Sequence, residues 1–279
     1  MLRLLKIEIT KLRYNKMAKV ITIVYFSLIC LTALIASYEF DFGGVHFRLA
    51  DQGIFNFPYI WHFNSWIAAW LKIFFAIVIV SMVANEYRNR TLKQNLIDGL
   101  SKKEFIISKF LTVLLYAVIS TIFLFIVTLI LGLIFSDFNE FSIIFSDMQY
   151  LFGYFIKLLG FFSFCMFLGI LVKRSAFALG ALGVWWLFEG ILFLIFSVIK
   201  SRSNLDLTQS VTQFFPLKAI FNINVEPFSK LGVIQSIAGQ LNEDFSNDYG
   251  IHWYQVLIVL VWTFLFIYWS YVLIKKRDL

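Results

Sequence analysis

Three ionisable residues, Lys72, Lys157 and Glu189, lie within long apolar stretches of the sequence. An unpaired charge deep in a bilayer costs at least about 2.5 to 3.5 kcal/mol, so each side chain should find a partner or face the interior of a helix bundle. Glu189 could pair with either lysine and fix how helices pack. Alternatively, a leftover lysine faces a translocation path and meets anionic groups, or a lysine snorkels to the interface.

Motifs for covalent or hydrolytic chemistry are missing from the sequence. It contains no G-x-x-x-x-G-K-[ST] phosphate loop, no H-E-x-x-H and no G-x-S-x-G. The isolated histidines show no metal-ligand spacing: His46, His62 and His252. We therefore predict no catalytic residue, no metal site and no cofactor bound by this chain, which cannot hydrolyse ATP by itself.

The segments that hold the three charges are long and apolar. Of the 279 residues, 60% are hydrophobic and 15% are charged, whereas soluble domains carry about 25% charged residues. Six stretches approach the roughly 20 residues that a helix needs to cross a hydrocarbon core. They lie near 20–37, 64–84, 110–135, 150–172, 175–199 and 254–274. The sequence predicts an all-α polytopic membrane protein with six transmembrane helices in a single domain, 1–279.

The basic residues are distributed unevenly between the loops. Of the 24 Lys and Arg residues, 17 fall on the side that carries both termini and five fall on the other side. The positive-inside rule therefore predicts cytoplasmic termini, and the net charge of +7 requires no nucleic-acid partner. In this orientation Lys72 and Lys157 lie roughly 10 to 12 Å below the outer surface, and Glu189 lies roughly 15 Å below it.

The N-terminal segment has a helical pattern of its own. Leu2, Leu5, Ile9 and Leu12 recur at helical spacing, and basic residues occupy the opposite side. This pattern predicts an amphipathic helix within 1–19 that lies in the membrane interface.

Two outer segments carry weaker signals. Gly43 and Gly44 predict a turn in the loop over 38–63. Between 200 and 253, the apolar stretches 214–223 and 231–239 are too short to span a membrane. They are expected either to dip into the bilayer or pack on the bundle, or to form a small external cap.

The charged loop 85–109 carries its own stop and start signals. The pattern favours a helix from Glu86 to Ile97 that ends at Gly99, because glycine accepts the left-handed conformation that closes a helix. Ser101-Lys102-Lys103-Glu104 forms a capping box, which predicts a new helix that runs directly into the third span. The loop is thus expected to be a rigid docking element rather than a set of charges that anchor span ends.

This loop resembles the cytoplasmic loop of ABC transporter permeases of the type-2 export class (type V exporter fold). The resemblance rests on Glu86, Asn89-Arg90-Thr91-Leu92, Leu100-Ser101-Lys102-Lys103-Glu104-Phe105 and Lys109. The overall layout is also similar, with an interfacial helix, six spans and a large segment before the last span that contains Phe215-Pro216-Leu217 and Pro227-Phe228. Arg90 and Leu100 stand where members of that family often have glycine and proline.

The resemblance implies a permease subunit of an ATP-driven exporter in the cytoplasmic membrane of a bacterium. Its implied partners are a cytoplasmic ATPase subunit, which binds ATP and Mg, and a second permease, identical or related. The expected ATPase-docking residues are Glu86, Arg88, Arg90, Thr91, Leu92, Leu96, Gly99, Ser101, Lys102, Lys103, Glu104 and Phe105, with a minor contribution from Lys173, Arg174 and Ser175.

Two other functions compete with this interpretation. A secondary transporter could use Lys72, Lys157 and Glu189 as an ion relay, but such folds usually carry broken helices and inverted repeats, and the sequence predicts neither. A non-transporting membrane scaffold could use the charged loop to dock a signalling protein.

Overall fold

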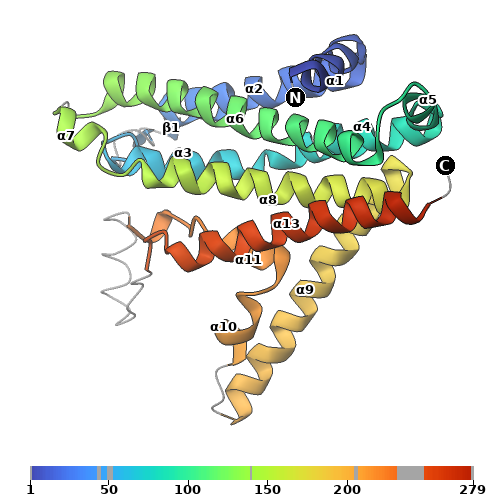
Figure 1. The fold of residues 1–279 in the computed structure, drawn as a ribbon. Coiled ribbons are helices and arrows are strands. Elements are labelled where there is room, and N and C mark those ends of the chain that lie inside the picture. The colour runs from blue at the N-terminus through green and yellow to red at the C-terminus, as the bar shows by residue number, and fades with distance from the viewer. Residues whose placement is uncertain are drawn as a thin grey trace.

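Long helices make up most of the chain in the computed structural model (Figure 1). The structure describes residues 2–42, 45–48, 53–138, 140–203, 207–230 and 248–277. Within these ranges, four helices are long and apolar enough to cross a membrane, or up to six spans if two bent helix pairs each count as one. The four are α6 (Lys102–Phe135), α8 (Gln149–Val172), α9 (Ser175–Ser203) and α13 (Trp253–Lys276). These helices confirm the prediction of a helical, multi-pass membrane protein. The number of spans and the side of the membrane on which the termini lie stay predictions.

The first bent pair consists of α1 (Leu2–Tyr14) and α2 (Lys16–Ser37), which meet at 88°. Asn15 forms the corner, because its side chain accepts a hydrogen bond from the Ala18 backbone amide and so caps the start of α2. The helix predicted within 1–19 is therefore present over Leu2–Tyr14 as an element separate from α2, and its location in the membrane interface stays a prediction.

The second bent pair corrects the prediction of one unbroken span over 64–84. Here α3 (Tyr59–Trp70) and α4 (Lys72–Arg88) differ in direction by 44°. The Lys72 ammonium donates a hydrogen bond to the Ala69 carbonyl at 2.9 Å and so satisfies a backbone acceptor at the end of α3. A broken helix is therefore present where the sequence, which has no proline or glycine in this stretch, predicted none.

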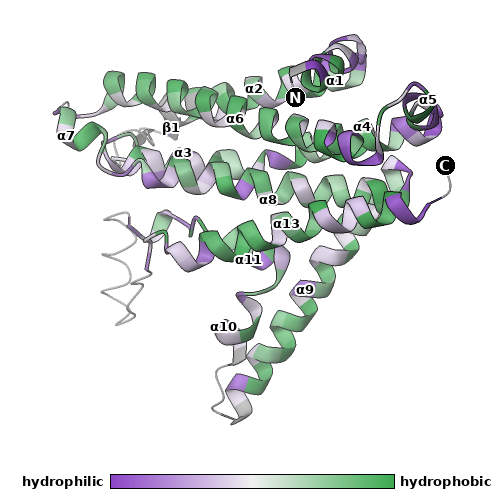
Figure 2. Ribbon diagram, viewed as in Figure 1, coloured by the Kyte–Doolittle hydropathy of each residue, from purple (hydrophilic) through white to green (hydrophobic). Residues whose placement is uncertain are grey.

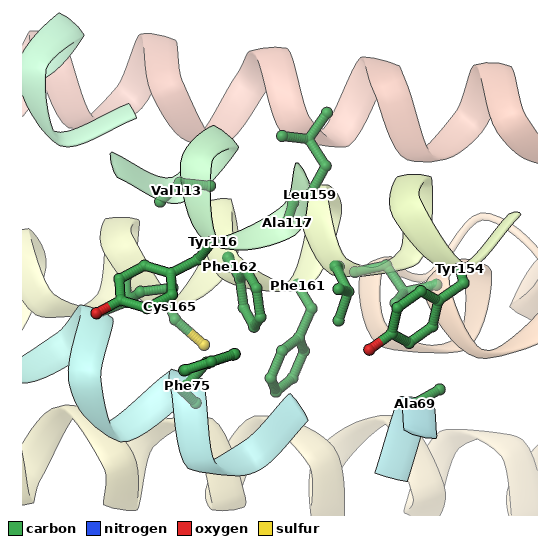
Figure 3. Packing of buried hydrophobic residues seen from close by; sticks show 14 of the residues in the cluster. Ala69, Phe75, Val113, Tyr116, Ala117, Tyr154, Leu159, Phe161, Phe162 and Cys165 are labelled. Carbon is green, nitrogen blue, oxygen red and sulfur yellow. The ribbon is translucent and has the colours of Figure 1, made fainter. Parts of the chain in front are cut away.

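Helix α8 lies at the centre of the fold and packs against α3, α4, α6, α9 and α13. Aromatic rings fill the space around it: Phe75 contacts Tyr116 and Phe162, with ring centroids 4.7 and 5.9 Å apart (Figure 3). At Gly160, an added Cβ would lie 2.6 Å from Val259 of α13. This glycine therefore allows α8 and α13 to approach closely.

Helix α9 diverges from the other long helices along its length (Figure 1). Among its described side chains, only Ala178, Leu182 and Glu189 are buried, and their spacing puts them on one stripe. The rest of its surface is largely apolar (Figure 2). Most of α9 therefore faces lipid or a partner rather than its own bundle.

Short elements connect the long helices. They are α5 (Thr91–Ile97), α7 (Phe141–Ile144), α10 (Leu207–Thr212), α11 (Pro216–Asn222) and the 3-10 helix η2 (Phe228–Lys230). Helix α11 packs against α8, α9 and α13, so the stretch 214–223 is part of the bundle rather than an external cap. The stretch 231–239 lies outside the described residues.

A small hairpin, which the sequence did not predict, accompanies the otherwise helical structure. Strands β1 (Glu39–Phe42) and β2 (Val45–Arg48) pair antiparallel, with Phe42 opposite Val45. Apolar and polar residues alternate in both strands, which suits an extended backbone, but four residues are too few to stand out in the sequence. The turn predicted at Gly43 and Gly44 falls outside the described part of the chain.

Candidate functional site

One end of the bundle gathers α1, α5 and the C-terminal end of α13 (Figure 1); we call it the basic end. Helix α4 stops at Arg88, and Arg90 has a left-handed backbone with φ 55° before α5 begins. The predicted single helix from Glu86 to Ile97 is therefore wrong. The Thr91 hydroxyl donates to the Glu86 carboxylate at 2.5 Å, which fixes the start of α5 against the end of α4.

The predicted helix stop at Gly99 is confirmed. Gly99 has φ 95°, and its amide donates to the Leu96 carbonyl. The Leu100 amide donates to the Asn95 carbonyl at 3.0 Å, which completes a Schellman motif. The end of α5 is thereby closed by its own backbone.

The predicted capping box is also confirmed. The Ser101 hydroxyl accepts the Glu104 amide at 3.1 Å, and the Glu104 carboxylate accepts the Ser101 amide at 2.9 Å. Helix α6 then continues without a break for 34 residues. The sequence therefore predicted both the stop of one helix and the start of the next.

Four charged side chains form an ionic cluster beneath the loop, in which three are buried and Lys11 is partly exposed: Glu8, Lys11, Glu86 and Lys109. Lys109 lies at its centre, is 0% exposed, and donates to Glu8 and to Glu86 at 2.7 Å each. Lys11 donates to Glu86 at 2.8 Å and lies 3.7 Å from Glu8. Two cations thus balance two carboxylates, and the cluster joins α1, α4 and α6.

The C-terminal end of α13 is tied to the same region. The Lys102 ammonium donates to the Arg277 carbonyl at 3.0 Å. The Arg277 guanidinium donates to the Ile170 carbonyl at 2.6 Å and to the Leu171 carbonyl at 3.1 Å, at the end of α8. A cation near helix C-terminal carbonyls is favourable, so these contacts hold α6, α8 and α13 together at the basic end.

The predicted docking residues fall into three groups of exposure. Exposed to solvent are Arg88, Arg90, Gly99, Ser101, Lys103 and Glu104; half-buried are Thr91, Leu96 and Lys102; buried are Glu86, Leu92 and Phe105. The buried residues support the loop, the exposed ones are accessible to a partner, and the half-buried ones are accessible in part. The Lys173 ammonium lies 5.8 Å from the centre of the Tyr87 ring of α4, which puts the turn before α9 beside the loop.

An exposed apolar residue on α5 was missed by the sequence analysis. Ile97 is 75% exposed, and Lys93 lies one helical turn before it on the same side of α5. Together they form what we call the α5 face. The α5 face could have been found from the sequence, because Ile97 is an isoleucine within a highly charged segment.

Glu189 does not form the predicted pair with Lys72 or Lys157 in the described structure. Its carboxylate accepts the Leu217 amide at 3.0 Å and the Lys218 amide at 2.9 Å, in the first turn of α11. Trp185 also donates to it at 2.7 Å. Backbone amides at a helix start lack partners within the helix, so the carboxylate binds them in preference to a distant lysine.

The two lysines instead meet around one aromatic ring. The Lys72 ammonium lies 4.5 Å from the centre of the Phe221 ring, and the Lys157 ammonium lies 5.8 Å from it. Lys157 also donates to the Asn224 carbonyl at 3.3 Å. The structure thus brings the lysines together near the end of α11, whereas Glu189 lies at its start.

A titratable group outside the long helices lies close to this region. The Lys230 ammonium donates to the Tyr150 hydroxyl at 3.2 Å. Burial lowers the pKa of Lys230 from its usual value, and the Asp147 carboxylate partly opposes this change. The half-buried Lys230 side chain thus lies against two aromatic rings, with its ammonium 5.3 Å from the centre of the Tyr150 ring and 4.5 Å from that of Tyr249.

The family model described as "Protein of unknown function (DUF2705)" matches residues 31–279. The chain belongs to this family. No curated protein matches the chain. The DUF2705 match includes the charged loop, Lys109 and the two lysines near Phe221, but it begins after α1. Glu8 and Lys11 therefore lie outside the matched residues.

Glu8 and Lys11 were not predicted as site residues of this DUF2705 member. Glu8 is the acidic residue of α1, and it lies one helical turn from both Leu5 and Leu12, on the apolar stripe. A lone carboxylate on an apolar stripe indicates a buried partner. This pattern could have revealed Glu8, although it would not have identified Lys109 as its partner.

Proposed function

We propose that this protein is the permease subunit of an ATP-driven ABC exporter. A separate cytoplasmic ATPase would bind and hydrolyse ATP with Mg, and a second permease, identical or related, would complete the transport path. The observation that carries the proposal is the arrangement of α5: a short helix, closed by Gly99, directly precedes the capping box that starts the 34-residue α6. The basic end is then cytoplasmic, in agreement with the positive-inside rule.

The ionic cluster supports a coupling role because it makes the basic end stiff. Lys109 of α6 contacts carboxylates from α1 and α4. Leaving a buried charge without its partner costs about 3 to 5 kcal/mol, so an arrangement that separated these helices while the charges stayed buried would be strongly disfavoured. A force on α5 would move α1, α4 and α6 together rather than bend the loop.

The chemistry of the α5 face supports a protein partner. An exposed isoleucine surrounded by basic residues suits an interface with an apolar centre and a charged rim. Ile97 would supply the centre, and the rim would come from Lys93 with Arg88, Arg90 and Lys103. We expect the ATPase to offer an apolar pocket with acidic residues around it.

Photo-crosslinking tests this proposal in native membranes. A photoreactive amino acid at Ile97 should trap a subunit that contains a G-x-x-x-x-G-K-[ST] phosphate loop. The same amino acid at Ile134, which is 66% exposed near the opposite end of α6, is the matched control and should not trap it. Capture of only proteins without a phosphate loop from position 97 would contradict the proposal.

A charge reversal gives a second test on the same face. Lys93→Glu should reduce co-isolation of the ATPase, whereas Lys276→Glu, also exposed at the basic end, should have a smaller effect. Equal losses in both variants would indicate a general effect of charge on the complex.

One observation favours a secondary transporter as the second candidate. Such transporters often form their sites at broken helices, and the break between α3 and α4 lies directly beside Lys72. Ion-coupled uptake by the purified chain alone in vesicles would support this alternative. Uptake that requires an ATPase subunit and ATP would support the exporter.

A further inference from the structure

A crevice lies between α9, α4 and α11, and we call it the α9 crevice. One part has a volume of about 520 Å³ and is lined by Lys72, Phe161, Gly183 and other residues. An adjoining part of about 600 Å³ shares Trp70, Trp186, Leu217 and Phe221 with the first. These volumes are in the range of pockets that hold small organic ligands.

Among the residues that line the first part of the crevice, Lys72 is the charged one, and most of the others are apolar or aromatic. The Lys72 ammonium is buried, and among the described residues it makes one hydrogen bond, to the Ala69 carbonyl, although an ammonium has three donors. In the part of the chain that the structure describes, no ion pair links Lys72 to an acidic side chain. Its other close neighbours are the faces of Phe221 and Phe161, at 4.5 and 5.2 Å.

The other ionisable residues near the crevice leave Lys72 as its available cation. The Lys157 ammonium lies 5.8 Å from the centre of Phe221. Glu189 lines the adjoining part, but its carboxylate is bound to the backbone amides of α11. Lys218, which also lines that part, holds its ammonium 4.6 Å from the centre of the Phe193 ring.

The sides of α9 next to the crevice are exposed and apolar. Trp186, Leu187 and Leu194 each have more than half of their surface exposed. An alkyl chain that entered the crevice could therefore continue over these apolar side chains of α9, which is coloured as mostly hydrophobic in Figure 2. A ligand that is charged at one end and apolar along its length matches both features.

We propose that the α9 crevice binds a single-chain amphiphile with a carboxylate head, of the fatty-acid type. The carboxylate would bind Lys72, and the alkyl chain would lie against Trp186 and Phe221. One ammonium balances the single negative charge of a carboxylate. As a statement about cargo this rests on the proposed exporter function, but binding to the purified chain does not depend on it.

The test uses the full chain, purified in detergent, and two photoreactive probes: a diazirine analogue of palmitic acid and its methyl ester. The acid should label peptides around Trp186 and Phe221 about tenfold more than the ester, because a hydrogen bond between charged groups is worth about 1.5 kcal/mol or more. Equal labelling by both probes would overturn the proposal.

Substitutions at Lys72 test whether this side chain causes the stronger labelling by the acid probe than by the ester probe. Lys72→Met should reduce labelling by the acid to the level of the ester, and Lys72→Arg should keep the preference. If Lys72→Met does not elute as a folded protein, the glycines of α9 provide the decisive pair. Unchanged preference in a folded Lys72→Met would overturn the assignment.

Gly183 and Gly180 form a matched pair for the crevice itself. An added Cβ at either position meets no atom within 4 Å, so both variants should fold. Gly183 lines the crevice and Gly180 is not among its lining residues. Gly183→Leu should therefore reduce labelling by both probes several-fold, and Gly180→Leu should not.

Two other occupants would give different results, and each would overturn the proposal. Bulk lipid alone would give labelling spread over the exposed faces of α9 and α13, with no dependence on Lys72 or Gly183. A second copy of the chain that fills the crevice would exclude both probes, and Gly183→Cys would then form a disulfide between copies. Failure to co-isolate an ATPase would disprove the exporter function without affecting these binding results.

Discussion

The basic end and the α9 crevice both contain buried lysines, but the ammonium groups have different kinds of partner in the two regions. At the basic end, the Lys109 ammonium contacts two carboxylates at 2.7 Å. In the crevice, Lys72 contacts a backbone carbonyl and two aromatic rings. Lys157, which is buried behind Phe221 and does not line the crevice, contacts a carbonyl and one ring.

This difference separates a structural use of charge from a binding use. The charge of Lys109 is already balanced by two carboxylates, so a further anion would gain little there, and removing the lysine would leave buried carboxylates without their partner. A lysine that retains free donors near an open cavity pays a desolvation cost that an anion can offset. The following predictions test whether the two regions differ in this way.

The largest effect is expected from Lys109→Met. Removing the central cation leaves Glu8 and Glu86 buried close together, which should cost about 3 to 5 kcal/mol of stability. Thermal unfolding in detergent should show a large fall in the midpoint. Lys103→Met, at an exposed position on the same helix, is the control and should change it little. A similar midpoint for both variants would mean that the ionic cluster is not structural.

Glu189 should act on α11 and not on the lysines. Glu189→Ala removes the acceptor for the Leu217 and Lys218 amides and should cost about 1 to 3 kcal/mol. A double-mutant cycle of Glu189→Gln with Lys157→Met should give an interaction energy within about 0.5 kcal/mol of zero. A clearly larger interaction would restore the direct pairing that the sequence predicted.

Ser101→Ala should destabilise the protein by about 1 kcal/mol, because the Glu104 amide loses its cap. Ser101→Asp retains an acceptor at this position and should be nearly neutral. Hydrogen exchange of the first turn of α6 should increase only in the alanine variant. Increased exchange in both would show that the serine acts in some other way.

The smallest effect, and the one stabilising effect, is expected from Arg90→Gly. Arg90 has a left-handed backbone that glycine adopts without steric cost, so the variant should gain about 0.5 to 1 kcal/mol. Arg88→Gly is the matched control: it lies within α4 and should lose up to about 1 kcal/mol. Unfolding in detergent measures both changes in stability. If both variants gained stability, or both lost it, the result would contradict the left-handed conformation of Arg90.

Signals within a few residues of each other were sufficient to predict the loop. Gly99 and the pair of Ser101 and Glu104 lie within six positions, and local backbone geometry decides their roles. The break at Arg90 escaped prediction because arginine is a good helix former and gives no local sign of a left-handed backbone.

Partners that are distant in the sequence could not be predicted. Lys109 and Glu8 are 101 positions apart, and Glu189 and Leu217 are 28 positions apart. Hydropathy and charge show that such residues need partners, but only the packing of the helices decides which ones they meet. The bend beside Lys72 was missed for the same reason, since no proline or glycine marks it.

The corner at Asn15 makes the length of α1 as important as its composition. Successive residues of a helix are separated by about 100° of rotation, so one residue inserted between Glu8 and Asn15 would swing the carboxylate away from Lys109. Substitutions on the exposed side of α1 do not change the direction in which Glu8 points relative to the corner at Asn15, whereas insertions and deletions do. Evolution of this segment should therefore tolerate exchanges of residues and reject changes in their number.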